Sequence, residues 1–267
     1  SDTHVDRVEL DGRRAVGVVT ADGRQIGADR VVVCAGAIHS PAILLRSGVD
    51  TPGVGEGLKD HPAAPITLGL IADAVADPSS LAAATALQRD GLQVLPLNHV
   101  GPQAVGYGVL MPALMEVRSV GRITLADRDP RAHPRVEFRM LSDPEDLQRL
   151  IGAVELTLGL VRHPAFEAIV RAAYIDVAGT TIDALGSRDR IAEWLRGSVG
   201  DYVHASCSCR MGVVVDGDCR VNGYEGLFVC DASVFADIPA VNTHLPTVML
   251  AETMASRWLN GRPAPGS

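Results

Sequence analysis

Two short apolar runs near opposite ends of the sequence place the strongest constraint on the fold. They are Val31–Cys34 and Leu227–Cys230. Continuous apolar runs of this length are typical of strands that are buried on both faces of a parallel sheet. Each run ends in a turn of small residues, Ala35-Gly36 in the first case and Asp231–Ser233 in the second. Because ligands of open α/β sheets bind beyond the carboxyl ends of the strands, both turns are candidate ligand contacts.

The first third of the chain also contains hairpin and helix signals. Two alternating apolar runs, Val5–Leu10 and Ala15–Thr20, are followed by the turns Asp11-Gly12 and Asp22-Gly23, a pattern that predicts β-hairpins. Ser40 as N-cap and Pro41 as first helical residue predict a short helix that ends before Gly48. The segment Thr51–Pro65 is rich in Gly and Pro, so we expect an irregular crossing between domains there.

The middle of the chain has a different character. It contains the strand-like runs Ile66–Ile71, Val105–Met111, Val117–Leu125 and Arg135–Phe138. A long amphipathic helix then begins at Asp143, with acidic residues in its first turn that suit the helix dipole. A second parallel-sheet element and an apolar helix over Thr247–Leu259 follow. The pattern predicts an α/β protein, α+β overall, in which an antiparallel domain is inserted into a parallel-sheet domain.

Composition excludes several functional classes. The chain has 267 residues, of which 47% are hydrophobic and 21% charged, as in a soluble globular protein. A net charge of −8 without a basic cluster argues against nucleic acid as a partner. No apolar run reaches the ~18 residues of a membrane-spanning helix. Five cysteines, an odd number, favour a reducing, cytoplasmic compartment, and the spacing of Cys207 and Cys209 does not predict a metal site.

Two further segments carry candidate catalytic groups. His204 lies in a loop-like stretch without apolar periodicity, and an imidazole can exchange a proton near neutral pH. Asn242 and His244 stand where the C-terminal helix begins, and the free N–H groups of that helix can stabilise negative charge. Each feature has a structural alternative: His204 competes with seven other histidines, Asn242 can cap the helix, and the small-residue turns can serve close packing alone.

Taken together, these segments resemble the glucose-methanol-choline (GMC) family of FAD oxidoreductases. Gly36–Gly48 is similar to the second signature of that family, and Gly57–Pro62 is similar to its Asn-Leu-x-Asp-His-Pro segment. The segments that resemble its substrate domain are Gly121–Leu125, Asp129-Pro130 and Leu141–Asp146. Those that resemble its C-terminal block are His204–Gly212, Asp231–Ser233 and Asn242–Thr247. The resemblance extends over nearly the whole chain.

The resemblance implies FAD as the cofactor and a small alcohol as the substrate. His204 would accept the hydroxyl proton, and Asn242 would hold the alcohol oxygen while a hydride moves to the flavin N5. The implied FAD contacts are Val5 at the adenine, Ala35 and Gly36 near the ADP part, Asp231 and Ala232 near the diphosphate and ribityl chain, and His244, Pro246 and Thr247 near the isoalloxazine. Residues 1–62 and 200–267 would form part of a Rossmann-like FAD-binding domain, and 63–199 the substrate-binding domain.

The sequence also departs from the family pattern. Cys207-Ser208 stands where the family usually has Gly-Thr, and His244 replaces a usual Asn or Gln. Family members begin with a strand and a GxGxxG motif, which this sequence does not contain. We therefore expect an N-terminal FAD-binding segment as a partner, from the same gene or a separate chain, and little activity without it. Two alternatives remain, a hydroxynitrile lyase built on the same fold and a non-catalytic binding module.

Overall fold

The computed structural model describes residues 2–260 except 78, 81–82, 84 and 100–103. Contacts group the chain into two compact units, unit 1 (Ser1–Asp60, Val120–Arg139 and Val203–Ser267) and unit 2 (His61–Ser119 and Met140–Tyr202). The expected division at 1–62, 63–199 and 200–267 differs from this grouping mainly at Val120–Arg139. That segment belongs with unit 1 because its strand β10 (Gly121–Thr124) pairs with β5 (Glu56–Leu58).

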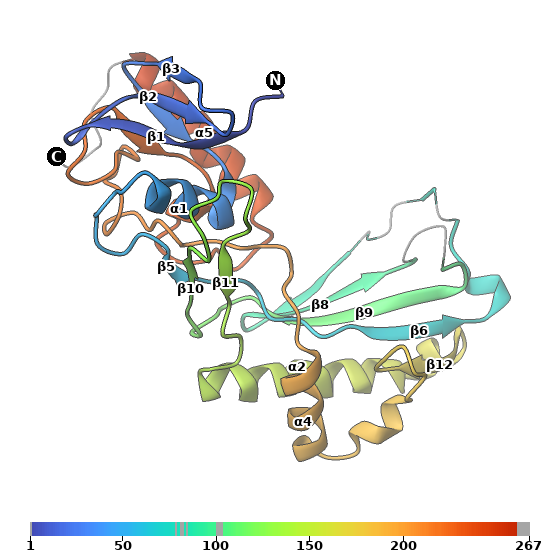
Figure 1. The fold of residues 1–267 in the computed structure, drawn as a ribbon. Helices are drawn as coiled ribbons and strands as arrows, with labels where there is room; N and C mark the ends of the chain where they lie inside the picture. The colour runs from blue at the N-terminus through green and yellow to red at the C-terminus, as the bar shows by residue number, and fades with distance from the viewer. Residues whose placement is uncertain (1, 78, 81–82, 84, 100–103, 261–267) are drawn as a thin grey trace. The chain divides into compact units, whose positions relative to one another are not determined.

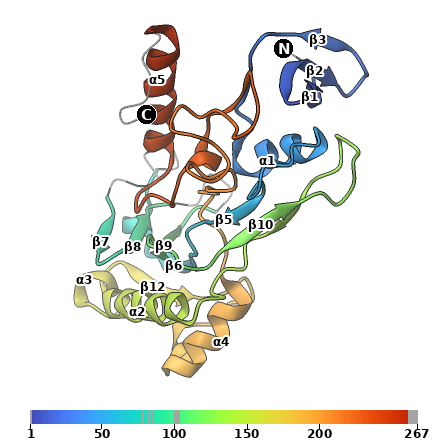
Figure 2. The ribbon, with the colours of Figure 1, turned by 90° about the vertical axis from the view of Figure 1, so that its left-hand side faces the viewer.

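The N-terminus of unit 1 is an antiparallel sheet of three strands (Figures 1 and 2). These are β1 (Val5–Asp11), β2 (Arg14–Thr20) and β3 (Gln25–Gly27). The turns between them contain Gly12 at φ 57° and Gly23 at φ 86°, a left-handed conformation that favours glycine. The predicted hairpins are confirmed.

The two apolar runs form adjacent parallel strands, as the sequence predicts. β4 (Val31–Val33) pairs with β13 (Leu227–Val229), with Val33 opposite Val229. The expectation that β4 is buried on both faces is wrong. Side chains alternate along a strand, and only Val31 and Val33 face the core, whereas Val32 is 37% exposed. Cys34, which follows β4, is also exposed.

The helix after β4 begins earlier than the sequence predicts. Helix α1 spans Gly36–Arg46, so Pro41 lies inside the helix instead of at its first position. A proline has no N–H, and Pro41 therefore leaves the carbonyl of Ala37 without its usual intrahelical donor. The Ser208 hydroxyl donates to this carbonyl over 2.6 Å. Ser208, which is distant from α1 in the sequence, thus completes the hydrogen bonding of this helix.

The Gly- and Pro-rich segment after α1 is irregular, as predicted, except for one short strand. It contains β5, which joins β10 and β11 (Arg135–Glu137) in a three-stranded sheet. A Cβ atom on Gly55 would lie 2.4 Å from the Ile123 carbonyl oxygen, and one on Gly57 would lie 2.6 Å from Arg210 Nε. Both glycines also have positive φ, so they permit close backbone approach.

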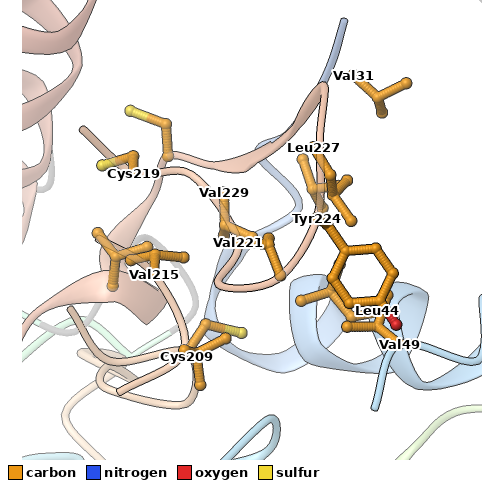
Figure 3. Close-up of a cluster of buried hydrophobic side chains, with 14 of the residues drawn as sticks. Val31, Leu44, Val49, Cys209, Val215, Cys219, Val221, Tyr224, Leu227 and Val229 are labelled. Atoms are coloured by element: carbon orange, nitrogen blue, oxygen red, sulfur yellow. The ribbon is translucent and has the colours of Figure 1, made fainter. Parts of the chain in front are cut away.

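The strands and the C-terminal helix of unit 1 share one apolar core (Figure 3). Helix α5 (His244–Asn260) contributes Met254, with Leu250 and Trp258 packed against the cluster. The helix begins at His244, three residues before the expected start at Thr247, because the Thr247 amide already donates to the Thr243 carbonyl over 3.0 Å. Pro246 therefore lies within its first turn, as predicted.

Unit 2 is an antiparallel sheet with helices on one face (Figures 1 and 2). The strand order is β12 (Val170–Tyr174), β6 (Ile66–Leu70), β9 (Tyr107–Leu114), β8 (Leu92–Leu97) and β7 (Leu87–Arg89). Helix α2 (Pro144–Val161) packs on β8 and β9, and α3 (Pro164–Glu167) and α4 (Arg188–Ser198) follow it. The Asp143 side chain caps α2 by accepting from the Glu145 amide. The predicted α+β architecture with an antiparallel part is confirmed.

Three short 3-10 turns complete the secondary structure. They are η1 (Ala72–Ala74), η2 (Ile182–Leu185) and η3 (Ala232–Val234). Within the part of the chain that the structure describes, every helix is too short or too polar to cross a membrane. All five cysteines are free thiols.

The bond from Ser208 to the Ala37 carbonyl can be tested by a double-mutant cycle. We expect Ser208→Ala to lower the free energy of unfolding by about 1–3 kcal/mol, because a buried carbonyl loses its donor. In a Pro41→Ala background the amide of residue 41 can donate instead, so the same substitution should cost about 1 kcal/mol or less. Urea unfolding of the four proteins measures both costs. Equal costs in the two backgrounds would contradict this pairing.

Candidate active site

The segment that contains His204 is held between two other parts of unit 1. On one side, Ser206 and Lys59 exchange backbone hydrogen bonds of 2.9 and 3.1 Å, and the Gly55 amide donates to the Ser208 carbonyl. On the other side, three amides donate to carbonyls of the 232–234 turn: Cys207 to Ala232, Cys209 to Ser233 and Met211 to Val234. Alternate residues therefore bond to opposite sides, as in a central strand.

His204 itself is held by a carboxylate. Its backbone amide donates to both oxygens of Asp60, at 3.1 and 3.0 Å, and both residues are buried. Burial lowers the pKa of the imidazole below its usual 6.5, because the charged form loses solvation. The ring is therefore neutral at pH 7, which is the protonation state that a general base needs.

Asp231 connects the two apolar strands beyond their carboxyl ends. Its Oδ2 accepts from the Gly36 amide over 2.9 Å and from the Ser40 hydroxyl over 2.5 Å, and its Oδ1 accepts from the Ser233 amide over 2.8 Å. The Ser40 hydroxyl in turn accepts from the Ala35 amide. The predicted residues Ala35, Gly36, Asp231 and Ala232 are thus brought together, with the carboxylate of Asp231 placed at the N-terminus of α1.

A pocket of about 540 Å³ in unit 1 has two predicted cofactor residues in its wall, Val5 and Ala35. The rest of the wall is largely apolar and comes from β1, β2, β4 and α1. Its other lining residues are Thr3, His4, Val8, Val18, Val31, Val32, Val33, Cys34, His39, Ile43 and Arg46. The volume lies in the range of small-molecule and cofactor sites.

The remaining predicted residues lie at the start of α5. Asn242 and His244 are exposed, and Pro246 and Thr247 are half-buried. The Thr247 amide makes the first intrahelical bond there, so the amides of His244 and Leu245 precede the hydrogen-bonded helix. Two N–H groups and the positive end of the helix dipole are thus available to a ligand at this point. The meeting of His204 with Asn242 remains a prediction.

Three residues of this framework were not predicted as site residues: Asp60, Ser40 and Ser208. Asp60 belongs to the Gly57–Pro62 segment that resembles a family motif, so a signal for it was present. Ser40 was interpreted as a helix cap, and its bond to Asp231 depends on a residue far away in the sequence. No local sequence pattern predicts such long-range partners.

Cys207, which stands where the family usually has glycine, has a left-handed backbone. Its φ is 71°, and its side chain is fully buried. Burial raises the pKa of this thiol, and that of Cys209, to about 12, so both are neutral and unreactive. Among the described residues, no three His, Cys, Asp or Glu side chains gather as they would around a metal ion.

Two family models match the chain, and both describe a GMC oxidoreductase. One matches residues 117–251 and the other residues 1–63. The chain belongs to the GMC oxidoreductase family. The predicted family is therefore confirmed, and members of this family are FAD-binding flavoproteins.

Two bacterial enzymes are among the curated relatives of this GMC oxidoreductase. The 5-(hydroxymethyl)furfural oxidase of Methylovorus sp. (strain MP688) is 33% identical over 97% of this chain and 56% of the oxidase. The oxygen-dependent choline dehydrogenase of Paraburkholderia xenovorans (strain LB400) is 30% identical over 97% of this chain and 56% of the dehydrogenase. The chain thus spans about half the length of the curated relatives it matches.

Solved structures support the fold of this GMC oxidoreductase. Pyridoxine 4-oxidase from Mesorbium loti superposes with a TM-score of 0.81 at 22% identity, covering 98% of this chain and 58% of that one. Formate oxidase superposes with a TM-score of 0.83 at 19% identity, covering 96% and 59%. At these identities the likeness establishes the fold alone.

The connecting role of Asp231 predicts a large stability effect. Asp231→Ala leaves three donors near α1 and η3 without their acceptor, and we expect a loss of about 3 kcal/mol or more in the free energy of unfolding. Asp237→Ala is the matched control, since its carboxylate is 69% exposed and pairs with Lys59 at the surface, and it should cost about 0–1 kcal/mol. Similar losses in the two variants, measured by urea unfolding, would refute the role of Asp231.

Proposed function

We propose that this chain is the catalytic part of an FAD-dependent alcohol oxidoreductase, with His204 as the general base. The observation that carries the proposal is the position of the His204 segment between residues 55–60 and 232–234, with a neutral imidazole on a buried, hydrogen-bonded backbone. The family membership supplies the cofactor and the general reaction class. The relatives named as a choline dehydrogenase and a furfural oxidase support small alcohols as substrates.

The pocket of about 540 Å³ fits the adenine end of FAD. A flat aromatic base needs apolar walls, and valines from β1, β2 and β4 provide them. His4, His39 and Arg46 add polar groups at its wall. Val5 and Ala35, both predicted as FAD contacts, lie in this wall, which supports the assignment.

The diphosphate of FAD needs a different partner. The N-terminus of α1 would attract an anion, but the Asp231 carboxylate already occupies it. A diphosphate placed there would meet a negative charge. We therefore propose that a further segment, the N-terminal FAD-binding segment implied by the family resemblance, supplies the diphosphate site. Gly36 and Asp231 then act by shaping the adjoining turn, and Ala232 contributes a small side chain beside it.

The start of α5 fits the isoalloxazine end. The exposed amides of His244 and Leu245, together with the helix dipole, favour negative charge at this point. Pro246, which has no N–H, and the half-buried Thr247 complete the first turn of α5. When bound, FAD supplies the acceptor for the hydride that leaves the alcohol carbon.

Protein residues accept the hydroxyl proton of the alcohol and form a hydrogen bond to its oxygen. A ring nitrogen of His204 takes the hydroxyl proton, because burial keeps the imidazole neutral and able to accept it. The carboxamide N–H of Asn242 donates to the same oxygen and opposes the charge that develops on it. Asp60 fixes the backbone of His204 and so acts as a positioning residue.

Replacement of the base tests this assignment. In the flavin-loaded protein, supplied with its N-terminal segment, we expect His204→Gln to lower kcat by about 10²–10⁴-fold. His163→Gln is the control, because His163 caps α3 in unit 2 and has no part in the proposal. Anaerobic bleaching of the flavin by alcohols measures the reaction. An unchanged rate in His204→Gln would reject the base, and cyanohydrin cleavage without bleaching would favour the lyase alternative.

The pH profile offers an independent test. Because burial lowers the pKa of His204, the acid limb of log kcat/KM should have its midpoint below pH 6.5, with full activity above it. Kinetics over pH 4.5–8 determine the midpoint. A midpoint clearly above 6.5 would mean that the controlling group is another residue or that His204 gains an anionic partner.

A further inference from the structure

A pair of thiols in unit 1 has no part in the proposed reaction. Cys219 and Cys230 are both buried, at 0% and 8% exposure, and each thiol shifts the pKa of the other. Cys219 belongs to the apolar core and lies on the side of it away from Leu44 and Val49 (Figure 3). The two cysteines come from different backbone segments, so their contact is a product of the fold.

The backbone holds these two segments side by side. Arg220 pairs with Phe228 in an antiparallel bridge, and the Val229 amide donates to the Cys219 carbonyl over 3.0 Å. On the other side of β13, the Cys230 amide donates to the Val33 carbonyl over 3.0 Å. Both cysteines are therefore held by main-chain bonds in neighbouring backbone segments.

The pair also has unequal acidity. The interaction with Cys219 lowers the pKa of the Cys230 thiol, whereas the interaction with Cys230 and burial raise the pKa of Cys219. Burial raises the pKa of Cys207 and Cys209 to about 12. Because the thiolate is the reactive form, Cys230 is the more nucleophilic of the two paired thiols.

We propose that Cys219 and Cys230 are an oxidisable pair that forms an intramolecular disulfide on exposure to hydrogen peroxide. The Cys230 sulfur attacks one peroxide oxygen, so that an S–O bond forms, the O–O bond breaks and the leaving hydroxide takes up the thiol proton as water. The Cys219 sulfur then attacks this sulfenic acid. The S–S bond forms, the S–O bond breaks and a second water leaves with the Cys219 proton.

The disulfide would join the turn at 216–220 to the residue before Asp231. It would close a loop of about a dozen residues, which restricts the unfolded chain and so stabilises unit 1. Asp231 holds the α1 N-terminus and the η3 turn. Oxidation would therefore stiffen the framework of the candidate active site while leaving His204 and Asn242 chemically unchanged.

The test uses the full reduced chain, treated with hydrogen peroxide, alkylated in denaturant and weighed by mass spectrometry. We expect two fewer alkylated thiols than in the untreated chain, which has five free cysteines, and a peptide map that links Cys219 to Cys230. The apparent Tm should rise by roughly 5 °C and return to its starting value with dithiothreitol. Five alkylated thiols after treatment, or a link between any other cysteines, would overturn the proposal.

Variants separate the roles of the two sulfurs. In Cys219→Ser the disulfide should be absent, and dimedone should label Cys230, because the sulfenic acid then has no partner thiol. Cys34→Ser is the matched control and should still form the link, since Cys34 is outside the pair. The peptide map of the unsubstituted chain decides the question even if a variant does not fold. None of these readouts depends on flavin or on alcohol oxidation.

Discussion

The carboxylate of Asp231 is the interaction on which the candidate active site depends. It accepts hydrogen bonds from Gly36 and Ser40 at the start of α1 and from Ser233 in η3, and so joins segments 195 residues apart in the sequence. A buried carboxylate is costly unless donors surround it, and here the dipole of α1 adds to three such donors. The parallel pair β4 and β13 thereby ends in a fixed turn, and neither strand could supply this geometry alone.

The position of the His204 segment depends on this turn, at residues 232–234. Its amides at 207, 209 and 211 bond to the turn that Asp231 organises, and its other side bonds to residues 55–60, with Asp60 holding His204 itself. Pro41 has no N–H to donate within α1. The hydroxyl of Ser208, in the middle of the His204 segment, donates in its place. Backbone bonds set the position of the imidazole, and burial sets its proton affinity.

Local patterns in the sequence predicted the elements whose cause is local. The Asp-Gly turns, the parallel apolar runs and the long helix that begins after Asp143 all appear as expected. The errors have long-range causes: α1 starts at Gly36 because Asp231 and Ser208 replace the missing local bonds, and the short strand β5 forms by pairing with β10. Strands β7, β8 and β12 were not predicted, because apolar and polar residues alternate over too few positions in them. Resemblance indicated His204 and the segment that contains Asp60, but the bond between these two residues required coordinates.

The packed glycines near the boundary between the units have a practical consequence. A glycine-rich stretch such as Gly53–Gly57 is a usual choice for cutting a chain, permuting its termini or inserting a reporter domain. The Cβ atoms of almost any replacement would collide with Ile123 or Arg210, and a break would remove β5 from its sheet. Engineering of the two units as separate modules should therefore spare this stretch and use exposed turns, such as the one at Asp22-Gly23, for grafting.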